Sequence, residues 1–125
     1  MFRFTLPLAL TLLAAPAMAF TTTQGARVEA RGDGFEVLAQ PGLSASMAFC
    51  AAGTYAQSVL RLPAHARIWR ASAPPRRAGQ GVTFTTSAAA SAGKTGLFLF
   101  GEDDGSVSVA FAQSLCASQR SRFWR

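Results

Sequence analysis

The stretch Ser44–Leu62, S-A-S-M-A-F-C-A-A-G-T-Y-A-Q-S-V-L-R-L, decides the fold. It contains no proline and is rich in alanine, with leucine and methionine also present, so it predicts a helix. Ser44 or Ser46 can cap its first turn, and Pro63 marks its end because the residue before a proline avoids helical angles. No charge occurs in the stretch before Arg61, which predicts a helix that is buried on most sides.

Two residues of this helix constrain its surroundings. Gly53 is about 1 kcal/mol worse than alanine inside a helix, so it predicts that another backbone approaches closely there. Cys50 has one other cysteine in the chain to pair with, Cys116. Whether the two form a disulfide or stay separate buried thiols depends on the redox compartment.

The N-terminal segment bears on that compartment. Met1–Ala19 combines one early positive charge, an apolar run and the small residues Ala17-Met18-Ala19. This is the pattern of a secretory signal peptide, and we expect cleavage after Ala19. A retained anchor is the alternative, but two prolines interrupt the run and it is short for a membrane span. We therefore expect a periplasmic or extracellular protein with a Cys50–Cys116 disulfide.

The rest of the chain suits one domain with one core. We divide the sequence into a signal peptide at 1–19, a single α+β domain at 20–118 and a basic aromatic tail at 119–125. No other stretch is long and apolar enough to predict a transmembrane segment. The formal net charge of the sequence is +6, and loss of the signal peptide removes one arginine from it.

The segment Arg27–Gln40, R-V-E-A-R-G-D-G-F-E-V-L-A-Q, predicts a β-hairpin. We place its two-residue loop at Asp33-Gly34, because this register sets Arg31 opposite Glu36 and pairs apolar residues on the other face. Moving the loop one residue earlier would set Glu29 opposite Glu36, and two like charges would repel.

Three further segments have the composition of strands, and in the second of them Val82 and Phe84 should face inward. They are Ala66–Ala73, Gly81–Ser87 and Thr95–Gly101, the last a strongly apolar run expected near the centre of the sheet. Residues 106–118 fit a strand or a helix, and we favour a short helix capped by Ser106 or Ser108. The predicted fold is therefore α+β: an antiparallel sheet of about five strands, one long buried helix on one face and a short C-terminal helix.

Arginines supply the one suggestive functional pattern. Arginine pairs bidentately with phosphate and carboxylate, so an anionic lipid or glycan of the cell envelope is a candidate partner, whereas nucleic acid is not expected for an exported protein. The alternative is that these charges only maintain solubility. The candidate anion-binding residues are Arg67, Arg70, Arg76, Arg77, Arg120 and Arg122.

Signals for catalysis and for cofactors are weak. His65 is the single histidine, and a hydrolase would need it beside a serine and a carboxylate. Two cysteines and one histidine do not form a recognisable metal-ligand set, so we predict no metal and no cofactor. Residues 88–95 resemble a loose phosphate-binding loop, but an apolar strand-like run follows where a helix is required.

Several short motifs together resemble a group of small exported alphaproteobacterial proteins of unknown function. They are the signal peptide, F-C-A-A-G-T-Y-A at Phe49–Ala56, R-I-W-R at Arg67–Arg70, a G-V-T-F strand and S-L-C at Ser114–Cys116. The resemblance implies a shared disulfide-stapled domain and brings no catalytic residue with it. We therefore predict a non-enzymatic structural or binding module of the envelope, with a small hydrolase using His65 or an inhibitor-type module as alternatives.

Overall fold

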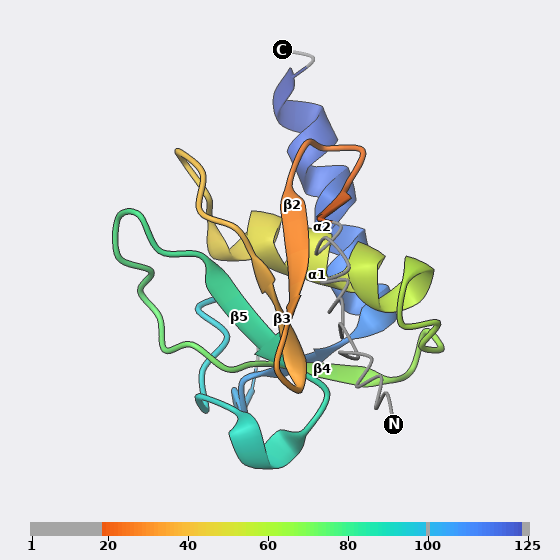
Figure 1. Ribbon diagram of the computed structural model, residues 1–125, viewed down its shortest axis with the longest axis vertical. Helices are drawn as coiled ribbons and strands as arrows, with labels where there is room; N and C mark the ends of the chain where they lie inside the picture. The colour runs from red at the N-terminus through yellow and green to blue at the C-terminus, as the bar shows by residue number, and fades with distance from the viewer. Residues whose placement is uncertain (1–18, 100, 124–125) are drawn as a thin grey trace, which may run out of the picture.

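The computed structural model of the chain describes residues 19–99 and 101–123, with side chains up to residue 117. It has the predicted α+β architecture, in which an antiparallel sheet of order β1-β2-β3-β5-β4-β6 packs against helices (Figure 1). The elements are β1 (Phe20–Thr21), β2 (Arg27–Arg31), β3 (Gly34–Val37), α1 (Ala45–Ser58), β4 (Arg67–Arg70), β5 (Val82–Thr85), the 3₁₀ turn Ala88–Ala90, β6 (Ser106–Ser108) and α2 (Val109–Phe123).

Helix α1 begins where the sequence predicts and ends earlier. Ser44 is the N-cap, and its hydroxyl accepts a hydrogen bond of 3.1 Å from the backbone N–H of Met47. The helix stops at Ser58, because Arg61 adopts a left-handed conformation with φ 57° and the N–H of Leu62 turns back to the carbonyl of Ala56. The predicted end at Leu62 is therefore too late by about one turn.

The core lies between α1 and the sheet. An aromatic cluster fills it: Phe35 packs on Tyr55 with ring centroids 4.7 Å apart, and Phe84 meets Phe49 edge-on at 4.9 Å. Val82 and Phe84 both face inward, as their alternation predicts. The aromatic side chains fix α1 across the middle strands, where Figure 1 shows it crossing β2 and β3.

The other side of α1 is covered by α2. Cys50 and Cys116 form a disulfide between the two helices with their Cα atoms 5.0 Å apart, which confirms the predicted pairing. One turn further along α1, a Cβ built on Gly53 would lie only 2.7 Å from the Cβ of Ala112, so the close approach predicted at Gly53 is confirmed. The helix is consequently buried between the sheet and α2, as its lack of charge indicated.

The predicted register of the hairpin is wrong. β2 and β3 pair with Glu29 opposite Glu36, and the loop is Gly32-Asp33 rather than Asp33-Gly34. Gly32 takes φ 52° at the first loop position, which glycine tolerates, whereas Gly34 lies inside β3 against the backbone of β5. The like charges are tolerated because Arg31 lies 3.0 Å from Glu36 and 3.9 Å from Glu29.

The prediction of a central strand at Thr95–Gly101 is wrong. The N–H and the hydroxyl of Thr95 both donate to the carboxylate of Asp103, so its polar groups close a loop instead of joining a ladder. Gly96 and Gly101 have φ of 80° and 91°, which interrupts an extended run. The sixth strand is β6 instead, which pairs with β4 along the edge of the sheet.

Both readings of residues 106–118 hold in part. Ser106–Ser108 is a strand, and a helix begins immediately after it at Val109. Ser108 caps that helix, since its hydroxyl accepts from the N–H of Phe111 at 3.1 Å. The helix continues to Phe123, so the backbone of much of the 119–125 tail is helical.

The predicted signal peptide lies, except for Ala19, outside the described residues. Phe20, the expected first residue after cleavage, begins β1, a short strand that the sequence did not predict and that pairs with β2. No helix within the described ranges is long and apolar enough to cross a membrane.

Candidate anion-binding site

Two of the predicted anion-binding arginines line one cavity. Arg70 is the last residue of β4, and Arg76 lies on the loop that leads to β5. The cavity has a volume of about 330 Å³, within the range of small-molecule sites. We call it the arginine pocket, and its lining residues are Leu43, Ala45, Arg70, Pro74, Pro75, Arg76, Val82 and Gly96.

Arg70 is almost wholly buried, with 2% of the residue exposed. Its Nε donates to the carbonyl of Ser72 at 2.8 Å and its Nη1 to the carbonyl of Thr95 at 2.9 Å. Within the described part of the chain, its Nη2 donates to no acceptor and no ion pair involves it. Desolvation lowers the pKa of Arg70, because burial penalises its charged form and no neighbouring carboxylate offsets the penalty.

Arg76 reaches the pocket from the loop that follows β4 and is held by carbonyl groups. Its Nε donates to Leu43 at 3.2 Å, and its Nη1 donates to Gln80 at 3.0 Å. Leu43 directly precedes the N-cap of α1, so Arg76 fixes the start of the helix at the pocket wall. Ala45, the first residue of α1, lines the same pocket. The first turn of a helix carries N–H groups without intrahelical acceptors, which favours an anion nearby.

The remaining wall of the pocket is apolar or bare backbone. Leu43, Val82 and the two prolines contribute hydrocarbon surface. Gly96 contributes backbone alone, because a Cβ there would lie 2.8 Å from Nη1 of Arg70 and 3.1 Å from Pro74. A cavity with two guanidinium groups and apolar sides suits an anionic group that carries a hydrocarbon portion.

Gly96 brings one loop to the pocket wall, here called the 91–105 loop, of which the structure describes residues 91–99 and 101–105. Arg70 holds this loop through the carbonyl of Thr95, and the carboxylate of Asp103 accepts from Thr95 and from the N–H of Gly105. Burial raises the pKa of Asp103, but its hydrogen bonds from Thr95 and Gly105, with a smaller contribution from Lys94, outweigh that effect and lower it. The rim is therefore a closed, hydrogen-bonded loop.

The other predicted arginines lie elsewhere. Arg67 donates to the hydroxyl of Ser106 at 2.8 Å, and Ser106 also bonds Asp104, so this arginine belongs to the β4–β6 edge. Hydrogen bonds from Ser106, and more weakly the charge of Arg67, lower the pKa of Asp104. Arg77 is exposed beside Arg76 but does not line the pocket. The side chains of Arg120 and Arg122 lie outside the described ones.

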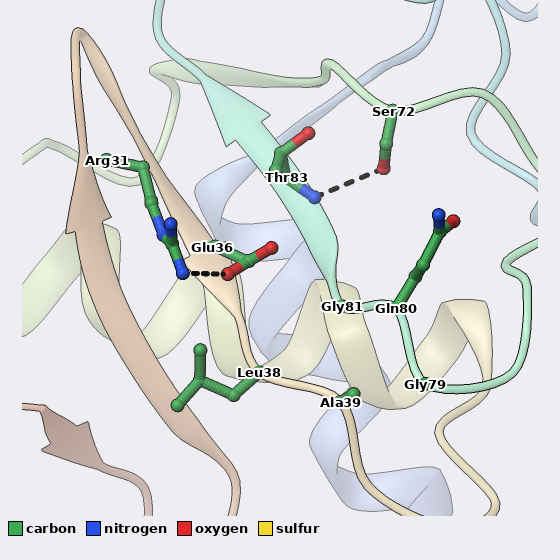
Figure 2. A pocket seen from close by; sticks show the side chains of 9 residues that line it. All are labelled: Arg31, Glu36, Leu38, Ala39, Ser72, Gly79, Gln80, Gly81 and Thr83. Carbon is green, nitrogen blue, oxygen red and sulfur yellow. Dashed lines mark hydrogen bonds and ion pairs between the residues drawn. The ribbon is translucent and has the colours of Figure 1, made fainter.

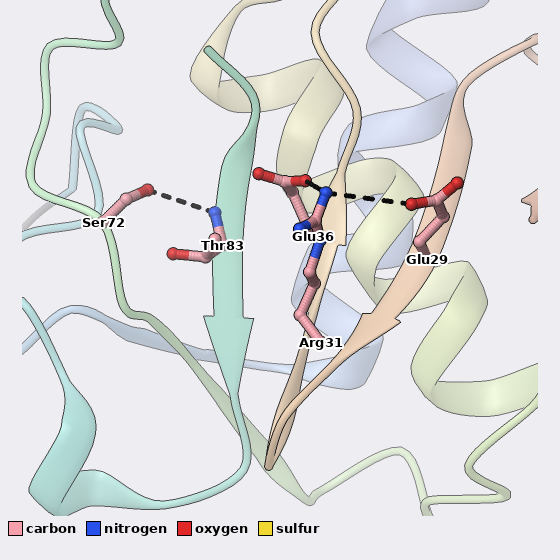
Figure 3. A network of polar contacts seen from close by, with 5 residues as sticks. All are labelled: Glu29, Arg31, Glu36, Ser72 and Thr83. Atoms are coloured by element: carbon pink, nitrogen blue, oxygen red, sulfur yellow. Dashed lines mark hydrogen bonds and ion pairs between the residues drawn. The ribbon is translucent and has the colours of Figure 1, made fainter. Parts of the chain in front are cut away.

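A second hollow of about 540 Å³ lies on the sheet face away from α1. Figure 2 shows its polar lining, with Glu36 and Thr83 from neighbouring strands and Gln80 from the loop before β5. Figure 3 shows Arg31 placed between Glu29 and Glu36, and the N–H of Thr83 donating to Ser72. Because the cation here is already paired with carboxylates, this hollow is a weaker anion site than the arginine pocket.

His65 lies exposed on the loop between α1 and β4. Among the described residues, no serine hydroxyl or carboxylate forms a hydrogen bond or ion pair with its ring. The arrangement that a hydrolase triad requires is thus not formed around His65 in this part of the chain.

Sequence reasoning named Arg70 and Arg76 but missed Ala45 and Gly96. Both missed residues contribute through backbone and through the small size of their side chains, which carry no chemical signal in a sequence. The cue available was the start of the predicted helix, which marks free N–H groups. Comparisons of the chain with protein-family models, curated proteins and solved structures found no match.

Proposed function

We propose that this protein is an exported, non-enzymatic binding module whose arginine pocket holds a phosphate or carboxylate group. Arg70 carries the proposal, because this residue is buried at the cavity and has no ion-pair partner among the described residues. An unpaired buried charge is unfavourable, and a bound anion would offset that penalty. Arg76 and the start of α1 add positive potential on the same wall.

Location in the cell envelope is part of the proposal. The predicted signal peptide at 1–19 supports it, as does the resemblance to small exported alphaproteobacterial proteins. The Cys50–Cys116 disulfide is compatible with an oxidising compartment. In such a compartment the available anions include the phosphates and carboxylates of lipids and glycans.

The test compares two adjacent arginines. Glycerol 3-phosphate and inorganic phosphate are titrated into the ¹⁵N-labelled mature protein, and amide shifts are followed by NMR. We expect the amides of Ala45 and Gly96 to move, because both residues line the pocket. Arg76→Ala should weaken binding by about tenfold or more, since a charge-assisted hydrogen bond is lost.

Arg77→Ala is the matched control, because it removes the same charge from the next residue outside the pocket. We expect it to change the affinity by less than about twofold, as a screened surface charge would. Equal weakening by both substitutions would mean that only general charge attraction operates. The proposal would be refuted if the wild-type protein bound neither glycerol 3-phosphate nor inorganic phosphate.

A further inference from the structure

Phe98 is the most exposed large apolar residue described, with 98% of its surface in solvent. Its neighbours Leu97 and Leu99 instead pack partly buried against the core. The segment is held in place, because Thr95 accepts from the N–H of Leu97 and is itself bonded to Asp103. A phenylalanine held outward in this way forfeits the gain of burying its ring.

Phe98 is close along the chain to a residue that lines the arginine pocket. Gly96 lines the pocket two residues earlier, so the Cα atoms of these two residues are at most about 7 Å apart. Gly96 also lies directly against Arg70, because a Cβ built on Gly96 would be only 2.8 Å from Nη1 of Arg70. An exposed phenylalanine therefore lies close to a cationic cavity.

Four basic residues, Arg70, Arg76, Arg77 and Lys94, lie on the pocket wall or within two residues of it along the chain, against three acidic residues on the 91–105 loop. Lys94 is exposed two residues before Gly96, and Arg77 is exposed next to Arg76 in the chain. Of the acidic residues on the 91–105 loop, Asp103 is turned to Thr95 and Asp104 to Ser106 by hydrogen bonds. Glu102 remains exposed as the opposing charge.

The geometry points to an anionic phospholipid bilayer as the partner. Phe98 enters the acyl region while the arginine pocket takes the phosphate of a lipid headgroup, and Lys94 and Arg77 face the anionic surface. This inference rests on the proposed anion site and adds the source of the anion. An aromatic ring beside basic residues is the combination that interfacial binding uses, since neither attraction alone gives stable attachment.

Sedimentation with vesicles tests the inference on the mature, disulfide-bonded protein. Vesicles of phosphatidylglycerol and phosphatidylcholine are compared with vesicles of phosphatidylcholine alone. We expect binding to the mixed vesicles only, and Phe98→Ser should weaken it by about tenfold to a hundredfold, the value of burying one phenylalanine. Phe111→Ser is the matched control, because Phe111 is another exposed phenylalanine, 43% exposed, and it lies on α2 rather than on the loop that carries Gly96.

The outcomes separate this inference from the proposed function. Binding of glycerol 3-phosphate without binding to the mixed vesicles would leave the anion site standing and overturn the bilayer as its source. Equal vesicle binding by Phe98→Ser and wild type would overturn the role of the ring. Vesicle binding that Arg76→Ala leaves unchanged would overturn the placement of the headgroup in the pocket.

Discussion

At the residue scale, Asp103 determines the shape of the pocket rim. One carboxylate receives the N–H and hydroxyl of Thr95 and the N–H of Gly105, and it thereby closes a loop that carries both Gly96 and Phe98. Arg70 reinforces the same loop by donating to the carbonyl of Thr95. Arg70 therefore has two roles, holding the rim and presenting charge to the cavity.

Asp103→Asn should change how stability depends on pH. The pKa of Asp103 is lower in the folded protein than in the unfolded chain, so its contribution is present above the unfolded value of about 4 and is lost as the pH falls through the folded value. Asparagine does not titrate, so the variant should lose the part of the acid destabilisation that comes from Asp103. Its curve of unfolding free energy against pH should therefore be flatter than that of wild type below about pH 4.

Urea unfolding at several pH values measures this effect. Glu102→Gln is the control, since within the described residues no hydrogen bond or ion pair involves that carboxylate. A wild-type and an Asp103→Asn curve of identical slope would contradict the assigned role of Asp103.

At the scale of elements, the contact of α1 with α2 depends on Gly53. Gly53→Ala should destabilise the protein by about 1–3 kcal/mol, because the new methyl group would collide with Ala112 and the backbone of Gln113. That figure is the cost of the collision alone. The higher helix propensity of alanine offsets about 1 kcal/mol of it. Thermal and urea unfolding of the variant measure the balance.

Ala112→Gly in the Gly53→Ala background supplies the matched test. Removing the opposing methyl group should recover part of the loss, so the double variant should be more stable than the two single changes predict by about 1 kcal/mol. Strict additivity would show that the two residues are not in contact in solution.

Elements with strong local signals could be predicted from the sequence. The cap at Ser44, the alternation of Val82 and Phe84, and the close packing at Gly53 all follow from local geometry. The segment Thr95–Gly101 could not, because a carboxylate several residues later takes the N–H that a ladder would need. Apolar composition alone does not distinguish a central strand from a loop of this kind.

The prediction of the hairpin register is wrong for a related reason. Pairwise comparison of opposite residues treats Glu29 and Glu36 as repulsive, and it neglects Arg31, which neighbours both on the same face. Only part of the site could likewise be predicted from the sequence, because Arg70 and Arg76 are brought together by the turn at Pro74-Pro75 and by the start of α1. Such juxtapositions depend on tertiary structure and leave no spacing pattern in the chain.

At the scale of the whole molecule, the disulfide joins α1, at the centre of the fold, to the C-terminal helix. Cys50→Ala with Cys116→Ala should lower the free energy of unfolding by about 4 kcal/mol in the chain-entropy model, given a separation of 66 residues. That is a large part of the stability of a typical domain. Urea unfolding of the double variant, beside wild type with and without reductant, measures it.

Reduced wild type should unfold at nearly the same urea concentration as the double alanine variant. A loss below about 1 kcal/mol in both would show that helix packing alone holds α2 in place. The result also bears on the envelope proposal, because a domain that needs its disulfide would accumulate only where thiols are oxidised.

The sheet of this protein ends in β1, of two residues, on one side and in β6, of three residues, on the other. Such brief borders give a neighbouring molecule almost no row of amide groups on which to build. Even when many copies crowd together, strand-to-strand pairing between molecules should find little template at these two borders.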